Sequence, residues 1–233
     1  MTAETKKEDV KPHHYGHRDR LRERFRTGGP DALPDYEILE LALFLVIPQK
    51  DVKLLAKELL TRFGTLAGVL NAPEYELEKF KYLKGNSITA LKVIRALSYR
   101  IMKQEVMHKP VLSSWSRLID YCAATMAHET RESFRILFLN KKNELMADEI
   151  QQTGTVDHTP AYPREIMKRA LELGATALIL CHNHPSGDPT PSQADIDMTR
   201  AIVAAGQTFS IVIHDHIIVA RNGTKSFKTM GLL

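Results

Sequence analysis

Residues 175–206 narrow the choice of folds more than any other stretch of the sequence. An apolar, strand-like run, ATALILCHNH, is followed by the turn PSGDPTP and then by SQADIDMTRAIVAAG, which has the pattern of a helix ending at Gly206. A strand, a tight turn and a helix in this order are typical of an α/β domain. We expect the chemistry of the chain to lie at this junction, where polar side chains are concentrated.

The flanking sequence repeats the alternation of helices and strands. The pattern predicts helices over 114–126 and 163–174, a hairpin of strands over 133–140 and 144–155, and one or two closing strands over 209–221. Pro110 marks the start of this mixed pattern. Residues 110–233 are therefore predicted to form an α/β domain with a partly parallel, mixed sheet.

The sequence before Pro110 has a different character. Residues 1–14 are polar and charged and predict a disordered tail, whereas the periodicity of residues 15–109 predicts a small all-α domain. Its last helix is expected to follow the segment KGNS at residues 84–87. The apolar residues expected to face inward in that helix are Ile88, Leu91, Ile94, Leu97 and Ile101.

Composition excludes several classes of protein. Two cysteines do not make a disulfide framework, and the polar N-terminus does not have the pattern of a signal peptide. The longest apolar stretch, residues 38–47, is too short to span a bilayer. A net charge of +4 is only weak support for an anionic partner. We expect a cytoplasmic protein without a membrane partner, and the sequence leaves its oligomeric state open.

Two histidines at the end of the expected strand point to a metal site. Side chains alternate between the faces of a strand, so His182 and His184 face the same way. Asp195 is expected in the first turn of the next helix. Two imidazoles and one carboxylate form a three-ligand set that leaves a fourth tetrahedral position for water, as in catalytic zinc sites. We therefore predict one Zn²⁺ per chain.

Hydrolysis by such a site also needs a proton acceptor and a donor to a developing oxyanion. We expect Glu149, in the second hairpin strand, to be the acceptor and the hydroxyl of Ser192 to be the donor. Ser192 and Asp195 also fit a helix capping box, a structural role that is compatible with a site. Glu165 is a rival acceptor, but acidic residues are favoured in the first turn of any helix.

Three other groups favour structural roles. The second His-x-His pair, His214 and His216, is followed by no carboxylate at ligand-like spacing, so we expect it to be structural. Cys181 is expected to pack on the strand face opposite the histidines. His158, in the turn before the helix at 163–174, is expected to bond to backbone rather than to line a cleft.

The spacing of His182, His184, Ser192 and Asp195 resembles the JAMM (MPN+) metalloprotease motif. The wider text from ADEIQQTGTVDHTP to SQADIDMT is similar to the RadC family, the bacterial branch carrying this motif. The resemblance implies a cytidine-deaminase-like α/β sandwich, zinc at the two histidines and the aspartate, and Glu149 as general acid/base. It also implies cleavage of an amide bond, commonly an isopeptide bond, in a peptide or protein substrate.

The segment FKYLKGNSITALKVIRAL resembles the second half of a helix-hairpin-helix, a unit that contacts the DNA backbone. The resemblance makes Lys84, Gly85, Ser87 and Lys92 candidate nucleic-acid-binding residues. Ser87 stands where such motifs have a second glycine, so close approach of the backbone to phosphate is harder. A helical domain that binds partners or mediates oligomerisation explains this half of the sequence equally well.

Two functions of different classes therefore remain. One is a zinc-dependent metallohydrolase that cleaves a peptide or isopeptide bond, with DNA binding through the N-terminal domain. The other is a DNA-associated repair or recombination accessory protein in which the C-terminal domain is a scaffold. A zinc deaminase is disfavoured, because those enzymes carry His-x-Glu and Cys-x-x-Cys patterns that do not occur at this site.

Overall fold

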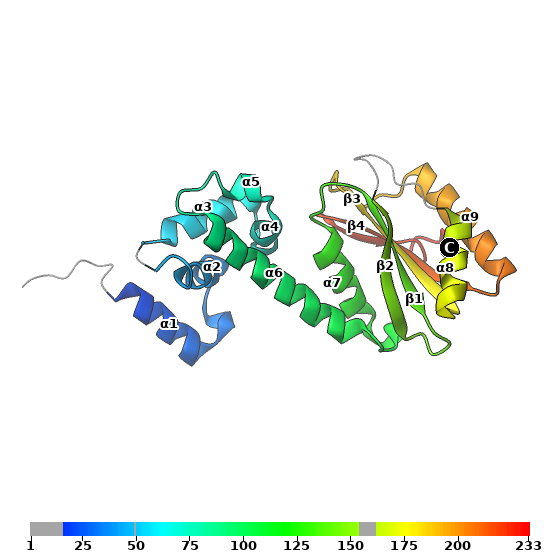
Figure 1. The fold of residues 1–233 in the computed structure, drawn as a ribbon, viewed down its shortest axis with the longest axis horizontal. Coiled ribbons are helices and arrows are strands. Elements are labelled where there is room, and N and C mark those ends of the chain that lie inside the picture. Colours follow the sequence, from blue (N-terminus) through cyan, green and yellow to red (C-terminus); the bar gives the residue numbers. More distant parts are fainter. Residues whose placement is uncertain (1–15, 49, 154–161) are drawn as a thin grey trace, which may run out of the picture. The chain divides into compact units, whose positions relative to one another are not determined.

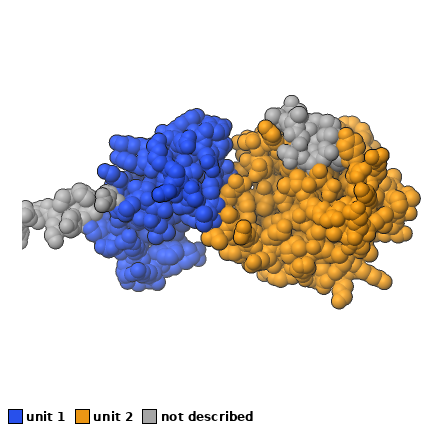
Figure 2. Space-filling model, viewed as in Figure 1, with its two compact units in different colours: residues 1–94 blue, residues 95–233 orange. Residues whose placement is uncertain are grey.

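The computed structural model describes residues 16–48, 50–153 and 162–233. The chain divides into two compact units, residues 1–94 and residues 95–233 (Figure 2). The expected disordered tail, residues 1–14, lies outside the described residues, and so does His158. Each unit is described separately below.

The first unit is helical, as expected. Its helices are α1 (His17–Gly28), the short 3-10 helix η1 (Pro30–Ala32), α2 (Asp35–Phe44), α3 (Lys53–Phe63), α4 (Leu66–Asn71), α5 (Glu74–Leu77) and the start of α6 (Gly85–Val106). Their leucines and other apolar side chains form one buried cluster. Among the described residues, no helix is both long and apolar enough to cross a membrane.

Helix α6 crosses the boundary between the two units, so the boundary falls inside a helix and earlier than the predicted change at Pro110. Ile88 and Leu91 are buried, as predicted. The prediction was wrong for Leu97 and Ile101, whose exposed fractions are 54% and 57%. A single inward face was expected for the whole helix, but its first turns and its last turns contribute to different cores.

The second unit contains the predicted α/β elements. They are η2 (Val111–Ser114), α7 (Trp115–Met126), β1 (Ser133–Leu139), β2 (Leu145–Thr153), α8 (Pro163–Leu173), β3 (Ala177–His184), α9 (Gln193–Thr208), β4 (Val212–Ala220) and β5 (Gly223–Ser226). Helix α9 continues two residues past the predicted end at Gly206. A glycine is needed there for packing, since a Cβ would lie 2.6 Å from the carbonyl oxygen of Ile211.

The five strands form one mixed sheet in the order β2-β1-β3-β4-β5. Strands β3 and β4 are parallel and are joined by α9, whereas the other neighbouring pairs are antiparallel. The predicted hairpin is confirmed as β1 and β2.

Helices cover both faces of the sheet (Figure 1). Helix α7 packs on one face with a cluster that includes Leu137, Ile179 and Cys181. Helices α8 and α9 contribute to a second cluster, which includes Phe134 and Leu180. Because strand side chains alternate, His182 belongs to the α8/α9 face and Cys181 to the α7 face, as predicted.

A buried ion pair fixes β1 to β2 on the α7 face. The Arg135 guanidinium donates to both carboxylate oxygens of Asp148 at 2.7 Å, and Tyr121 donates to the same carboxylate. The exposed fractions of the two charged side chains are 10% and 1%.

We expect Asp148→Ala to lower the free energy of unfolding by about 3–5 kcal/mol, because it leaves a buried guanidinium without its counter-charge. Urea unfolding of the full chain measures this change. Asp197→Ala, which removes an exposed ion pair with Arg200, is the matched control and should cost less than about 1 kcal/mol. Equal losses in the two variants would contradict the structural role of Asp148.

Candidate metal centre

The last residues of β3 carry the two predicted histidines. His182 is buried and His184 is half-buried, and both lie on the α8/α9 face of the sheet. The strand pairs with β1 through Phe134 and His182 and is hydrogen-bonded on its other side to β4. The imidazole of His182 therefore projects from a position that neighbouring strands hold on both sides.

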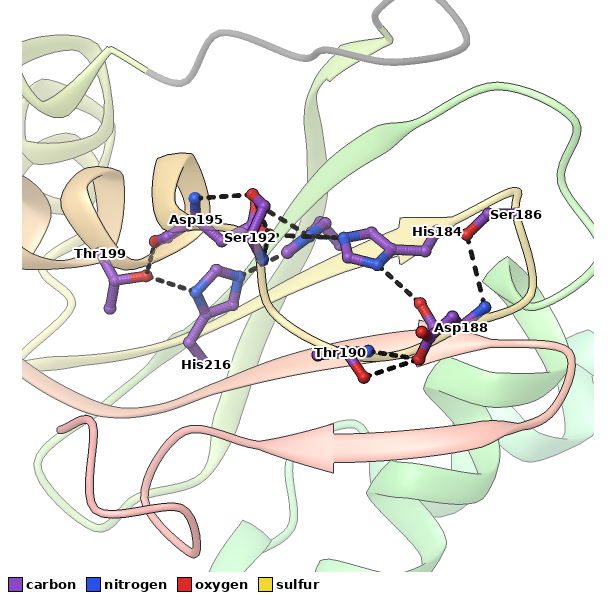
Figure 3. Close-up of polar contacts among 9 residues, drawn as sticks. His184, Ser186, Asp188, Thr190, Ser192, Asp195, Thr199 and His216 are labelled. Atoms are coloured by element: carbon purple, nitrogen blue, oxygen red, sulfur yellow. Dashed lines mark hydrogen bonds and ion pairs between the residues drawn. The ribbon is translucent and has the colours of Figure 1, made fainter.

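The turn after β3 returns the chain toward these histidines. Gly187 has a φ of 93°, a conformation that favours glycine. The Asp188 side chain accepts hydrogen bonds from the backbone and hydroxyl of Thr190 at 2.9 and 2.7 Å. The Asp188 carbonyl oxygen lies 2.8 Å from Nδ1 of His184 (Figure 3). Since a carbonyl can only accept, His184 donates from Nδ1, and its Nε2 is available as a ligand.

Asp195 completes the predicted cluster. Nε2 of His182 lies 2.8 Å from Nε2 of His184 and 3.2 Å from Oδ1 of Asp195. The distance from Nε2 of His184 to Oδ2 of Asp195 is 3.5 Å. Ligand atoms of the three residues all lie within 4.8 Å of one another, so they could hold one metal ion.

A capping box at the start of α9 orients Asp195. The backbone N–H and the hydroxyl of Ser192 both donate to Oδ2 of Asp195 at 2.7 Å, and the Asp195 N–H donates to the Ser192 hydroxyl at 3.2 Å (Figure 3). These bonds leave Oδ1 directed at His182. The predicted capping box therefore contains the predicted metal ligand, Asp195. A role for Ser192 as oxyanion donor stays a prediction.

The carboxylate of Asp195 and the two imidazoles are electrostatically coupled. Burial raises the pKa of Asp195, but hydrogen bonds with His182 and His184 outweigh it and hold the pKa well below its usual range. The hydrogen bond with Asp195 raises the pKa of His184. In the metal-free protein the His184 imidazole therefore interacts favourably with the Asp195 carboxylate.

A third histidine, expected only to be structural, contacts the cluster. His216, from the second His-x-His pair, is completely buried, and its Nε2 lies 2.8 Å from Nδ1 of His182. Burial holds its pKa well below the usual value. His214 instead hydrogen-bonds to the Asn143 side chain at 2.7 Å. The pair was expected to be structural; in the structure His214 bonds to Asn143, and His216 contacts the predicted ligand His182.

A protein-family comparison bears on this site. The family model described as RadC-like JAB domain matches residues 112–232. The chain belongs to the RadC-like JAB domain family. The match covers the sheet, its flanking helices and the His182–His184–Asp195 cluster, and it excludes the first unit.

Glu149, the predicted proton acceptor, lies elsewhere in the RadC-like JAB domain. Its carboxylate accepts from Nε and Nη2 of Arg169 on α8, at distances of 2.7–3.2 Å. The hydrogen bond with Arg169 lowers the pKa of Glu149. In the sheet order, β1 separates its strand from the strand that carries the histidines. These contacts do not support Glu149 as the base.

Glu132 is the carboxylate that the sequence reasoning overlooked. Strands β1 and β3 are antiparallel and pair Phe134 with His182, so the register places residue 132 opposite His184. The charge of Glu132 is among the causes that raise the pKa of His184, after the hydrogen bond with Asp195. Its position directly before a predicted strand was visible in the sequence, but only the strand register brings it to the histidines.

The side chain of Asn183 fixes the backbone on both sides of Glu132. Its Oδ1 accepts from the backbone N–H and hydroxyl of Ser133 at 2.8 and 2.9 Å, and its Nδ2 donates to the carbonyl of Arg131 at 3.0 Å. Asn183 has an exposed fraction of 1%. The residue between the two histidines therefore ties the start of β1 to the end of β3.

The candidate nucleic-acid-binding residues belong to the first unit. Helix α6 begins at Gly85, so residues 85–87, which were expected to precede the helix, are instead its first turn. Ser87 is buried, and its hydroxyl accepts from the backbone N–H of Lys84 at 2.8 Å. The Lys92 ammonium donates to the carbonyls of Leu70 and Ala72. Ser87 and Lys92 therefore have structural roles, and DNA binding by this unit stays a prediction.

Proposed function

We propose that this RadC-like JAB domain is a zinc-dependent hydrolase of the JAMM type that cleaves a peptide or isopeptide bond. The observation that carries the proposal is that Nε2 of His182 lies 2.8 Å from Nε2 of His184 and 3.2 Å from Oδ1 of Asp195, so that the three residues could hold one metal ion. Backbone and side-chain partners engage the other nitrogen of each imidazole and the other oxygen of the carboxylate.

The chemistry of the three residues fits zinc better than the hard cations. Imidazole nitrogens suit Zn²⁺, whereas Mg²⁺ and Ca²⁺ prefer sets of oxygen ligands. Two histidines and one carboxylate make three protein ligands. Catalytic zinc sites have three protein ligands, whereas closed structural sites have four. When bound, zinc would supply a Lewis acid and lower the pKa of a water molecule toward about 7.

We assign proton transfer to Glu132, which the strand register places opposite His184. A carboxylate there can accept a proton from the attacking water and return it to the leaving amine. The Asn183 side chain holds the backbone at residues 131 and 133 and so positions Glu132 relative to His184. Ser192 keeps Asp195 in its ligand orientation through two hydrogen bonds.

Hydrolysis of a peptide library by the full chain tests the proposal. We expect cleavage by the zinc-loaded protein, loss of cleavage after treatment with a chelator, and recovery when zinc is restored. Mass spectrometry of the products identifies the bond that is broken. Cleavage that persists at the same rate after the metal has been removed would contradict a zinc-dependent mechanism.

The scaffold alternative predicts a different result. A DNA-associated accessory protein would bind DNA with affinity that falls steeply with salt, and its function would not depend on the His182–His184–Asp195 cluster. Binding that is equally strong in a fragment of residues 110–233 would place the DNA site in the RadC-like JAB domain rather than in the first unit.

A further inference from the structure

His216 and Thr199 form a hydrogen-bonded chain behind the candidate metal centre. His216 lies on β4, next to Leu180 of β3 in the sheet, and Thr199 lies on α9. Both are buried, with exposed fractions of 0% and 1%. Figure 3 shows Thr199 between Asp195 and His216. The chain therefore begins at the backbone of one candidate ligand and ends at the ring of another, His182.

The direction of each hydrogen bond in this series follows from its first acceptor, the carbonyl oxygen of Asp195. That oxygen carries no proton, so it can only accept. Thr199 Oγ1 lies 2.6 Å from the carbonyl oxygen of Asp195, which can only accept. The single hydroxyl proton is therefore used in that bond. Nδ1 of His216, 2.6 Å from the same Oγ1, must then be the donor.

The next bond follows from the first two. A neutral imidazole carries one N–H, so a His216 protonated on Nδ1 has a lone pair on Nε2. His216 is packed against the rings of Phe134 and Phe227. Nε2 of His216 therefore accepts from Nδ1 of His182, 2.8 Å away.

We propose that Thr199 and His216 are positioning residues that hold His182 in the Nδ1–H tautomer, so that its Nε2 lone pair points at the metal site. The proposal rests on the metal centre proposed above and goes beyond it. Metal-binding histidines need an unprotonated ligand nitrogen, and a partner for the other ring nitrogen fixes both tautomer and ring orientation. For His184 the partner is the Asp188 carbonyl, whereas for His182 it is the chain to His216 and Thr199.

Two-bond ¹H–¹⁵N correlation spectra of the metal-free, full-length protein test the tautomers directly. His182 and His216 should both be protonated on Nδ1 in the wild type, with signals assigned by single substitution of each histidine. Thr199→Val removes the hydroxyl oxygen that accepts from Nδ1 of His216. His216 is then free to carry its proton on Nε2, so we expect a substantial population of His182 protonated on Nε2. Zinc affinity, measured by competition with a chelating dye, should fall about 10–100-fold.

Two controls separate positioning from a general effect on the fold. Thr199→Ser keeps the hydroxyl and should retain the wild-type tautomers and affinity. Thr208→Val removes a similar bond from a threonine to a carbonyl in the same helix, but Thr208 is not part of the hydrogen-bonded series. It should change neither the tautomers nor the zinc affinity. A wild-type His182 protonated on Nε2 would overturn the proposal, and so would a Thr199→Val protein with wild-type tautomers and affinity.

The outcome also distinguishes this inference from the proposed function. If the wild type shows both expected tautomers and Thr199→Val disturbs them, but neither protein binds zinc, the positioning chain is supported and the zinc hydrolase is contradicted. If zinc binds and the tautomers are reversed, the metal centre is supported and the positioning chain is contradicted.

Discussion

Glu132→Gln is expected to reduce peptide hydrolysis by about 10²–10⁴-fold while the protein keeps its zinc. Glutamine has nearly the shape of glutamate but cannot accept a proton at neutral pH. The register places residue 132 opposite His184, outside the set of three metal ligands. Initial rates of cleavage measure the first effect, and elemental analysis of the same preparation measures the second.

Glu149→Gln is the matched control for this prediction. The substitution is chemically identical, but it affects a carboxylate that is bound by Arg169. We expect its rate of hydrolysis to stay within a few-fold of the wild type. A large loss of rate in Glu149→Gln together with a normal rate in Glu132→Gln would restore the assignment that the sequence first favoured. Loss of zinc from Glu132→Gln would show that Glu132 is a ligand rather than a proton acceptor.

His184→Ala is expected to lower zinc affinity by more than about 100-fold, so that the purified protein contains almost no zinc. This exceeds the usual cost of losing an outer hydrogen-bond partner of a ligand, because one of three protein ligands is removed. Competition with a chelating dye measures the affinity.

His214→Ala controls for the loss of a histidine as such. His214 lies in the second His-x-His pair and hydrogen-bonds to Asn143 rather than to the cluster. We expect it to bind zinc as the wild type does. A His184→Ala protein that retains wild-type affinity, or a His214→Ala protein that loses its zinc, would refute the assignment of the ligands.

The cluster of His182, His184 and Asp195 could be predicted from the sequence because local rules determine the placement of its residues. Strand alternation puts His182 and His184 on one face, and the capping box brings Asp195 to the start of the next helix. Each rule spans only a few residues. The hairpin, the βα unit and the helix stop at Gly174 were predicted for the same reason.

The proximity of Glu132 to the histidines could not be predicted in this way. Residue 132 lies opposite His184 only through the register of two strands that are about 50 residues apart in sequence, and a shift of one residue would turn the side chains to the other face. Glu149 was favoured because it lies in a strand of the same hairpin, but that strand is not adjacent to β3. The contact of His216 with His182 was not predicted because the partners of His216 come from two other elements.

Helix α6 shows a different limit of sequence patterns. Its apolar residues recur at helical spacing along its length, which predicts one continuous buried face. Ile88 and Leu91 belong to the core of the first unit, and Val106 belongs to the core of the second. Periodicity identifies the helix, but it does not show that the helix changes its core along its length.

The zinc content of the purified full-length protein tests the central claim most directly. Elemental analysis of a folded preparation, with zinc supplied during expression, should give about one zinc ion per chain, and Asp195→Ala should abolish it. A folded wild-type protein that contains no metal and fails to take up zinc on titration would contradict a metal centre at His182, His184 and Asp195, and with it the proposed hydrolase.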